Sequence, residues 1–202
     1  MIRSPLRAGI ALACALSLSA CGGGDGDVYV GGAVVGNTKA GLVVTNNDGP
    51  RLEIGANQST FTFPELVETD AGYNVKVVAA PDNTQPSDPA NPATGCKVLE
   101  GTGSGKAIFA ISSVRIVCTL KSYKLTARIN GAHGAGLELI NGSDRKLVKP
   151  EETTVEMAPI PEGAVYGLAV LASPSGQTCT VPNPAGTMTT DGKIVDVNCT
   201  TP

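Results

Sequence analysis

The sequence predicts an all-β protein, with two tandem β-sandwich domains after a cleaved signal peptide and a Gly-rich tether. Three observations predict this fold class. Apolar and polar residues alternate with a period of two over many short segments, as in half-buried strands. Turn dipeptides such as Asn141-Gly142 and Asp191-Gly192 interrupt these segments at short intervals. Most of the chain after residue 27 is one pattern written twice, which indicates an internal repeat.

Composition narrows the function classes. The chain has 202 residues, of which 16% are charged and 3% are aromatic, and its formal net charge is −3. A nucleic-acid-binding domain is normally strongly basic, so this class is not expected. The length suits one large domain or two small ones.

Residues 1–20 have the pattern of a signal peptide. Arg3 and Arg7 form a short positive region, and the following stretch up to Ala20 is apolar or small. Such a stretch is too short to span a bilayer as a stable helix. We therefore expect residues 1–20 to be removed during export.

The signal region ends in Leu18-Ser19-Ala20-Cys21, which resembles the lipobox of bacterial lipoproteins. The resemblance implies transfer of diacylglycerol to the Cys21 thiol, cleavage after Ala20 and acylation of the new amine by a fatty acid such as palmitate. Gly22, at the position after the lipidated cysteine, implies sorting to the outer membrane. An ordinary secretory signal with a chance cysteine is the alternative.

The lipid on Cys21 is the expected membrane partner. Several acyl chains give stable anchoring without a transmembrane helix, and no later apolar run approaches the length of a span. Without Arg3 and Arg7 the mature chain has 13 basic against 18 acidic residues, a net charge of −5, so charge would not hold it on anionic lipid. Residues 21–27 are predicted to be the lipidated cysteine and a flexible tether; a calcium site in their Gly-Asp pairs is the alternative.

The repeat divides the rest into residues 28–121 and 122–202, each predicted to be one sandwich. The segment that begins at Tyr73 matches the one at Tyr166, and Cys96 and Cys118 match Cys179 and Cys199. The first copy carries an insert, Asp82 to Thr94, that is rich in Pro and polar residues and is expected to be an exposed loop. Its role is not evident from the sequence.

Each copy is predicted to contain about seven short strands, the number typical of a sandwich. In the first copy we expect strands at residues 28–35, 42–45, 51–54, 60–63, 73–80, 96–99 and 114–120. In the second copy we expect them at residues 123–129, 137–140, 146–148, 153–157, 166–171, 178–181 and 194–200. Two residues, Lys121 and Ser122, join the copies. So short a connection favours a rigid rod of two domains over two domains that move independently.

The two copies look like immunoglobulin-like β-sandwich modules. They are similar to the repeats of uncharacterised proteobacterial surface lipoproteins, on the motifs GLVVTNN at residues 41–47, FTF at 61–63 and PSGQTCTV at 174–181. The resemblance covers nearly all of the mature chain and implies the module rather than an activity. The first copy departs from it where the insert replaces the short PSGQT segment.

Four cysteines remain after Cys14 leaves with the signal and Cys21 takes lipid. Four cysteines allow three pairings, and the repeat selects Cys96–Cys118 and Cys179–Cys199 as disulfides within each copy. All four share the phase of buried positions on their strands, and an oxidising compartment lets such bonds persist. A zinc site or a redox pair is the alternative, although the chain has no CxxC spacing.

No catalytic, cofactor or metal residue is expected. His133, the one histidine, lies in a Gly-rich turn and is interpreted as a solvated loop residue. The segment from Gly101 to Lys106 resembles a phosphate loop but lacks its first Gly and its final hydroxyl, so a flexible hairpin loop is expected. The acidic residues fall in loops and at strand edges and are interpreted as a solvated rim: Glu65, Glu68, Asp70, Glu151, Glu152 and Glu156.

The resulting hypothesis is a non-enzymatic envelope lipoprotein of the bacterial outer membrane, facing the periplasm or the cell surface. Its role would be structural, adhesive or accessory, with an envelope protein or a surface glycan as a possible partner. The first alternative is a receptor module that binds a sugar or a peptide at one end of a sandwich. The remote alternative is a hydrolase, which would need a Ser and an acid close to His133.

Overall fold

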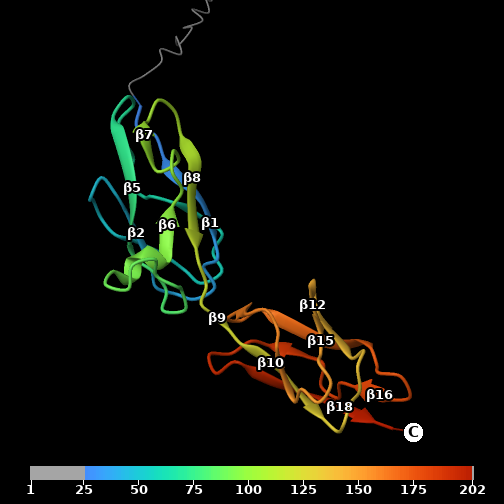
Figure 1. Ribbon diagram of the computed structural model, residues 1–202. Coiled ribbons are helices and arrows are strands. Elements are labelled where there is room, and N and C mark those ends of the chain that lie inside the picture. Colours follow the sequence, from blue (N-terminus) through green and yellow to red (C-terminus); the bar gives the residue numbers. More distant parts are fainter. Residues whose placement is uncertain (1–25, 202) are drawn as a thin grey trace, which may run out of the picture.

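A computed structural model describes residues 26–201, which form a chain built almost entirely of β-strands (Figure 1). The predicted signal peptide, Cys21 and the part of the predicted tether up to Asp25 lie outside the described residues. The helix η1 (Pro92–Gly95) is a single 3₁₀ turn. Within residues 26–201, no helix has the length and apolar character needed to cross a bilayer.

The first sandwich consists of two four-stranded sheets. One sheet has the strand order β4-β1-β8-β6, and the other has the order β3-β2-β5-β7. The strand bounds are β1 (Val30–Val35), β2 (Leu42–Asn46), β3 (Leu52–Ile54), β4 (Thr60–Thr62), β5 (Gly72–Ala79), β6 (Cys96–Val98), β7 (Ser104–Lys106) and β8 (Ile111–Cys118).

The second sandwich repeats this topology strand for strand. Its sheets have the orders β13-β10-β18-β16 and β12-β11-β15-β17. The bounds are β10 (Leu125–Asn130), β11 (Glu138–Asn141), β12 (Asp144–Leu147), β13 (Thr154–Glu156), β15 (Val165–Ala172), β16 (Thr178–Thr180), β17 (Ala185–Thr187) and β18 (Lys193–Thr200). A two-stranded ribbon of β9 (Ser122–Tyr123) and β14 (Ile160–Pro161) stands at its entrance.

In both sandwiches the first long strand lies parallel to the last. β1 pairs with β8, with Ala33 opposite Arg115, and β10 pairs with β18, with Leu125 opposite Lys193. All other strand pairs are antiparallel. The chain therefore enters each sandwich at one end and leaves it at the other, and the two sandwiches follow each other end to end (Figure 1).

Each sandwich encloses its own apolar core. The period-two alternation places every second strand residue inside, as in β5, where Tyr73 and Val75 are buried between exposed neighbours. Tyr166 occupies the same place in β15 and is 8% exposed, so both tyrosines are core residues. Phe61 and Phe63 pack edge to face at 5.6 Å in the first core. At this distance an aromatic pair adds to the stabilisation from burial alone.

Three sequence expectations need correction. The Gly-rich segment from Gly101 to Lys106 is not a plain loop, because its end forms β7 and pairs with β5. In the second copy, β17 likewise forms where the sequence pattern predicts no strand. The insert is not exposed throughout: Asn83 and Thr84 are 3% and 2% exposed, and Thr84 forms a β-bridge with Leu120. The start of the insert is therefore part of the wall of the first sandwich, held by a hydrogen bond of 2.6 Å from the Thr84 hydroxyl to the Pro81 carbonyl.

Candidate functional site

The four mature cysteines form two disulfides, one in each sandwich. Cys96 on β6 lies directly opposite Cys118 on β8, and Cys179 on β16 lies directly opposite Cys199 on β18. These are the two pairs that the repeat predicts. Each bond joins the last strand of its sandwich to an edge strand within one sheet. All four residues are at least 94% buried, which protects the sulfur atoms from reductants in solution.

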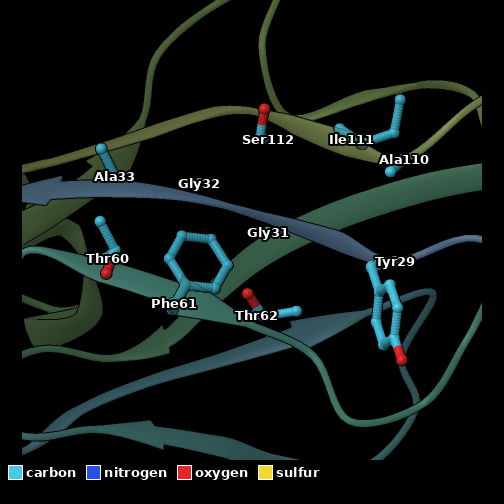
Figure 2. Close-up of a pocket in the computed structure, with 10 residues that line it drawn as sticks. All are labelled: Tyr29, Gly31, Gly32, Ala33, Thr60, Phe61, Thr62, Ala110, Ile111 and Ser112. Atoms are coloured by element: carbon cyan, nitrogen blue, oxygen red, sulfur yellow. The ribbon is translucent and has the colours of Figure 1, made fainter.

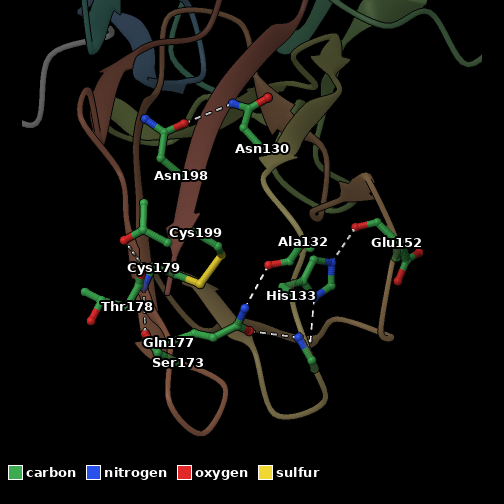
Figure 3. Close-up of a disulfide and its surroundings, with 12 residues drawn as sticks. Asn130, Ala132, His133, Glu152, Ser173, Gln177, Thr178, Cys179, Asn198 and Cys199 are labelled. Atoms are coloured by element: carbon green, nitrogen blue, oxygen red, sulfur yellow. Dashed lines mark hydrogen bonds between the residues drawn. A yellow bond between two sulfur atoms is a disulfide. The ribbon is translucent and has the colours of Figure 1, made fainter. Parts of the chain in front are cut away.

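His133 is not a solvated loop residue, as the sequence suggested, but is 6% exposed. Its Nε2 lies 2.9 Å from the Glu152 carbonyl oxygen, and its Nδ1 lies 3.3 Å from the Gly134 carbonyl oxygen (Figure 3). The Gln177 amide closes the same loop by donating to the Ala132 carbonyl at 2.8 Å. The sequence pattern could not find this burial, because the contacts come from a distant loop. His133 is a structural residue of this end of the second sandwich.

A polar network covers the outer face of β10 and β18. Arg128 donates two hydrogen bonds to Asp196, at 2.7 and 2.9 Å, and Asn130 donates to Asp196 at 2.9 Å. The Arg128 guanidinium, together with the Asn130 amide, lowers the pKa of Asp196 below its ordinary value. On the same face Asn130 also donates to Asn198 (Figure 3). Paired polar groups thus cover this part of the outer face, next to the exposed Ile194.

The matching stretch of β1 in the first sandwich carries only small residues on this face. Where β10 carries Thr126 and Arg128, β1 carries Gly31 and Ala33, opposite Thr62 and Thr60 of β4. The result is a groove of about 450 Å³ with Phe61 at its base and Tyr29 at one end (Figure 2). It is a shallow surface with few polar groups, so it offers shape and apolar contact rather than catalysis.

The glycines of this groove are required by close strand approach. A Cβ on Gly31 would lie 2.3 Å from the Phe61 carbonyl oxygen, and one on Gly32 would lie 1.9 Å from the Val114 carbonyl oxygen. The β1–β8 register also shifts between Val30 and Gly32. Because Gly31 has no side chain and Ala33 has only a methyl group, the sheet surface stays open here and forms the groove.

Ion pairs and hydrogen bonds from several segments link the two sandwiches at their junction. Lys39, from the loop after β1, forms an ion pair of 2.7 Å with Glu162 of the second sandwich and lies 3.7 Å from Asp82 of the insert. The hydrogen bond to Glu162 raises the pKa of Lys39. The Lys121 carbonyl accepts from the Glu162 backbone at 2.9 Å, and the Lys121 ammonium donates to the Asp82 carbonyl at 2.6 Å. The insert therefore belongs to the junction.

The remaining predicted residues do not converge on a reaction site. Glu156 pairs with Lys124 on the surface, and the Glu152 side chain accepts from the Lys149 backbone. Glu65 lines a small cavity at the far end of the first sandwich, away from His133 in the second. Among residues 26–201, no group of three or more His, Cys, Asp or Glu side chains is placed to hold a metal ion.

No protein-family model and no curated protein matches the chain. Solved structures with some similarity include a C-terminal fragment of the pilus adhesin SpaC from Lactobacillus rhamnosus GG, which is 12% identical with a TM-score of 0.34; the alignment covers 84% of this chain and 96% of that one. The Bacillus anthracis TIE protein is 11% identical with a TM-score of 0.39, over 85% of this chain and 34% of that one.

A single B repeat unit of the Staphylococcus aureus collagen-binding surface protein is 12% identical, with a TM-score of 0.24 over 88% of this chain and 100% of that one. At these values the similarities carry no argument about activity or partners. The repeated strand order, the two cores and the two disulfides characterise the chain by themselves: it is an all-β protein built of immunoglobulin-like β-sandwiches.

Proposed function

We propose that this chain is a non-enzymatic envelope lipoprotein whose two sandwiches, with the boundary at residues 121 and 122, form a load-bearing stalk. The stalk runs from a lipid anchor on Cys21 at the bacterial outer membrane to an adhesive or accessory contact at its far end. One observation carries the proposal: in each sandwich the first and last long strands are parallel neighbours, and the chain enters and leaves at opposite ends.

This topology matters for tension. When a sandwich is pulled from its entry and exit points, the force runs along β1 and β8 in opposite senses. The hydrogen bonds between parallel strands are spaced evenly along the pair, so this force loads them together rather than one at a time. Rupture then requires several bonds to fail at once, which slows forced unfolding.

The disulfides support the same role. After rupture of the first sandwich, the 22-residue separation between Cys96 and Cys118 stays closed and cannot extend. The second sandwich keeps a 20-residue separation closed in the same way. The stalk is thus limited in how far it can lengthen under load.

Single-molecule pulling of the mature protein between its two ends tests the mechanical role. We expect two unfolding events, and reduction of the disulfides should lengthen them by about 80 and 70 Å, at roughly 3.6 Å per released residue. When the force is applied to the first sandwich at Gln58, in the loop before β4, instead of at its entry point, we expect the hydrogen bonds between strands to break one after another. This unfolding should need a clearly lower force. Equal forces in the two geometries would contradict the load-bearing role.

The anchor has its own test. Cells that express the full chain are labelled with radioactive palmitate and compared with the Cys21→Ala variant, followed by protease treatment of intact cells. Label that depends on Cys21 supports the anchor, and label that is independent of Cys21 contradicts it. Cleavage of the body from outside indicates the cell surface, whereas protection indicates the periplasmic face.

A receptor for an extended peptide is the second candidate, and the bare groove of the first sandwich favours it. The second sandwich offers an internal comparison, since Arg128 fills the position that Ala33 leaves open. A displayed peptide library can be selected on the mature protein and counter-selected on the Ala33→Arg variant. Peptides that bind only the unmodified groove support this function, and a failure to enrich any contradicts it.

A further inference from the structure

We infer that the end of the first sandwich nearest Cys21 is a contact surface for the zwitterionic headgroup region of the membrane. We name this surface the anchor-proximal patch and define it by four exposed apolar side chains: Tyr29, Leu66, Ile108 and Phe109. The inference rests on the proposed lipid anchor and deepens it. It assigns the sandwich a fixed position against the bilayer, instead of a position held off by the tether.

The four side chains come from three segments that hydrogen bonds hold together. Their exposed fractions are 57% for Tyr29, 43% for Leu66, 60% for Ile108 and 70% for Phe109. Tyr29 precedes β1, and its carbonyl accepts from the Ile111 backbone at 2.7 Å. Val28 and Val67 form a β-bridge beside Tyr29 and Leu66. These segments make up the end of the sandwich at which the described chain begins (Figure 1).

The third segment is fastened to the second. The Asp70 backbone donates to the Ala107 carbonyl at 3.1 Å, and the Ala107 backbone donates to the Ala71 carbonyl at 2.9 Å. Ile108 and Phe109 follow directly on this pair of bonds. Side chains held on such a fixed frame lose little further conformational freedom when they contact lipid.

The length of chain before the sandwich brings a membrane within reach. The Thr69 hydroxyl donates to the Gly26 carbonyl, so the chain is fixed to this end of the sandwich from Gly26 onward. Cys21 lies five residues earlier, and five residues span at most about 18 Å when fully extended. A lipid on Cys21 therefore keeps the patch close to the headgroups.

The chemistry of the patch fits this layer. All seven Phe and Tyr residues lie within the described chain, and Tyr29 and Phe109 are the two with more than half of their surface exposed. Both are in the patch. Aromatic side chains with one apolar and one wet side are enriched where membranes meet water, and a Tyr hydroxyl can stay hydrated while its ring is covered.

The charged residues near the patch indicate which kind of lipid it contacts. They also argue against the binding of a second copy of the chain. Asp27, Glu65, Glu68 and Asp70 are exposed and lie within four residues of Tyr29 or Leu66 in the chain, and the exposed Lys106 precedes Ile108 by two residues. Anionic headgroups would be repelled by these carboxylates, so a zwitterionic surface is the better match. Two copies facing each other would bring their acidic residues together, and four side chains fall well short of the roughly 800 Å² per partner of a standard interface.

Tryptophan fluorescence tests the contact, because the chain has no tryptophan of its own. The lipidated mature protein with Phe109→Trp is reconstituted into phosphatidylcholine vesicles, with or without brominated acyl chains near the headgroup. The matched control is Leu147→Trp, at a 71% exposed position on β12 of the second sandwich. We expect blue-shifted emission that brominated lipid quenches for Phe109→Trp, and unshifted, unquenched emission for Leu147→Trp.

Vesicle flotation separates the possible failures. If the protein floats but Phe109→Trp is not quenched, the lipid contact is overturned and the anchor stands. If the protein does not float, the anchor and the contact both fall. If the blue shift depends on protein density and not on bromination, the patch binds a second copy instead. Partial replacement of phosphatidylcholine by an anionic lipid should weaken the quenching; stronger quenching would overturn the choice of zwitterionic lipid.

Discussion

At the scale of single residues, the two glycines of β1 show how one missing side chain shapes a surface. Gly32 sits where the β1 backbone passes so close to β8 that a methyl group would overlap the Val114 carbonyl oxygen, at 1.9 Å. The neighbouring atom is backbone in the middle of a sheet and cannot move aside cheaply. Gly31 and Gly32 thus allow both the close approach of the strands and the open groove.

We predict that Gly32→Ala destabilises the first sandwich by at least about 2 kcal/mol, because the added Cβ forces strands β1 and β8 apart. Gly167→Ala is the matched control: Gly167 also lies in a strand, β15, but a Cβ there meets nothing within 4 Å. The control should be neutral or stabilising by up to about 1 kcal/mol, since Ala limits the unfolded chain. Urea denaturation measures both, and equal stabilities would contradict the close-approach argument.

A second residue-scale prediction concerns acid. The lowered pKa of Asp196 means that the folded chain holds this carboxylate ionised more strongly than the unfolded chain does. The network therefore contributes its stability above the ordinary pKa of an aspartate, and this contribution is lost as the pH falls below about 4. Asp196→Asn should flatten the acid part of the stability curve of the second sandwich.

The control for this prediction is Asp191→Asn, in the turn before β18, where the exposed carboxylate makes no ion pair within the described residues. Thermal melts of both variants between pH 2.5 and pH 7 make the comparison, over the range in which aspartates titrate, about 2 to 5. If the stability of Asp196→Asn falls at low pH as steeply as that of the unmodified protein, the Arg128 network is not what the acid disrupts.

At the scale of elements, each disulfide fixes an edge strand to the strand that closes the sandwich. We predict that Cys96→Ser with Cys118→Ser costs about 3 kcal/mol of unfolding free energy, as the chain-entropy relation gives for a loop of this size. The Cys179→Ser with Cys199→Ser pair should cost a similar amount. The two losses should add, since the bonds lie in separate cores.

Equilibrium unfolding of the two double variants and of the fourfold variant measures this, with each sandwich followed by the NMR signals of its own buried tyrosine, Tyr73 or Tyr166. A loss in one pair that alters the transition of the other sandwich would contradict the independence of the two cores. It would indicate instead that the junction couples their unfolding.

Much of the element pattern is readable from the sequence, for a physical reason. Strands such as β5 and β15 alternate strictly because one face is buried, and the repeat marks the same strands twice. The disulfide pairs follow from that repeat. By contrast β7 was missed, because its residues Ser104, Gly105 and Lys106 are all exposed and carry no apolar alternation.

The parallel pairing of the first and last strands could not be predicted from the sequence either. The alternation of apolar and polar residues is a local property, whereas the pairing of two strands depends on residues far apart in the chain. The burial of His133 and of Asn83 depended on the same kind of distant contact. The groove could not be predicted either, since glycine in a strand signals a close approach without naming the atom approached. The lipid on Cys21 stays a prediction from the sequence, because Cys21 lies outside the described residues.

At the scale of the whole molecule, an ion pair and backbone hydrogen bonds link the two sandwiches at their junction. We predict that Lys39→Ala broadens the distribution of distances between spin labels placed on the two sandwiches, since it removes the 2.7 Å ion pair with Glu162. Lys124→Ala is the matched control, because it removes an ion pair of the same length within the second sandwich. Only the first variant should broaden the distances; identical distributions in both would place the stiffness in the backbone bonds of Lys121 instead.

The parallel pairing of the first and last long strands also has a consequence for the folding of each sandwich. Each sandwich pairs its first long strand with its last, so Leu125 meets Lys193 only when nearly the whole domain has been delivered. Contacts so distant in sequence form late and slowly. If the chain crosses a membrane N-terminus first, as a lipoprotein would, its second sandwich can close on the far side only after the C-terminal strand has crossed.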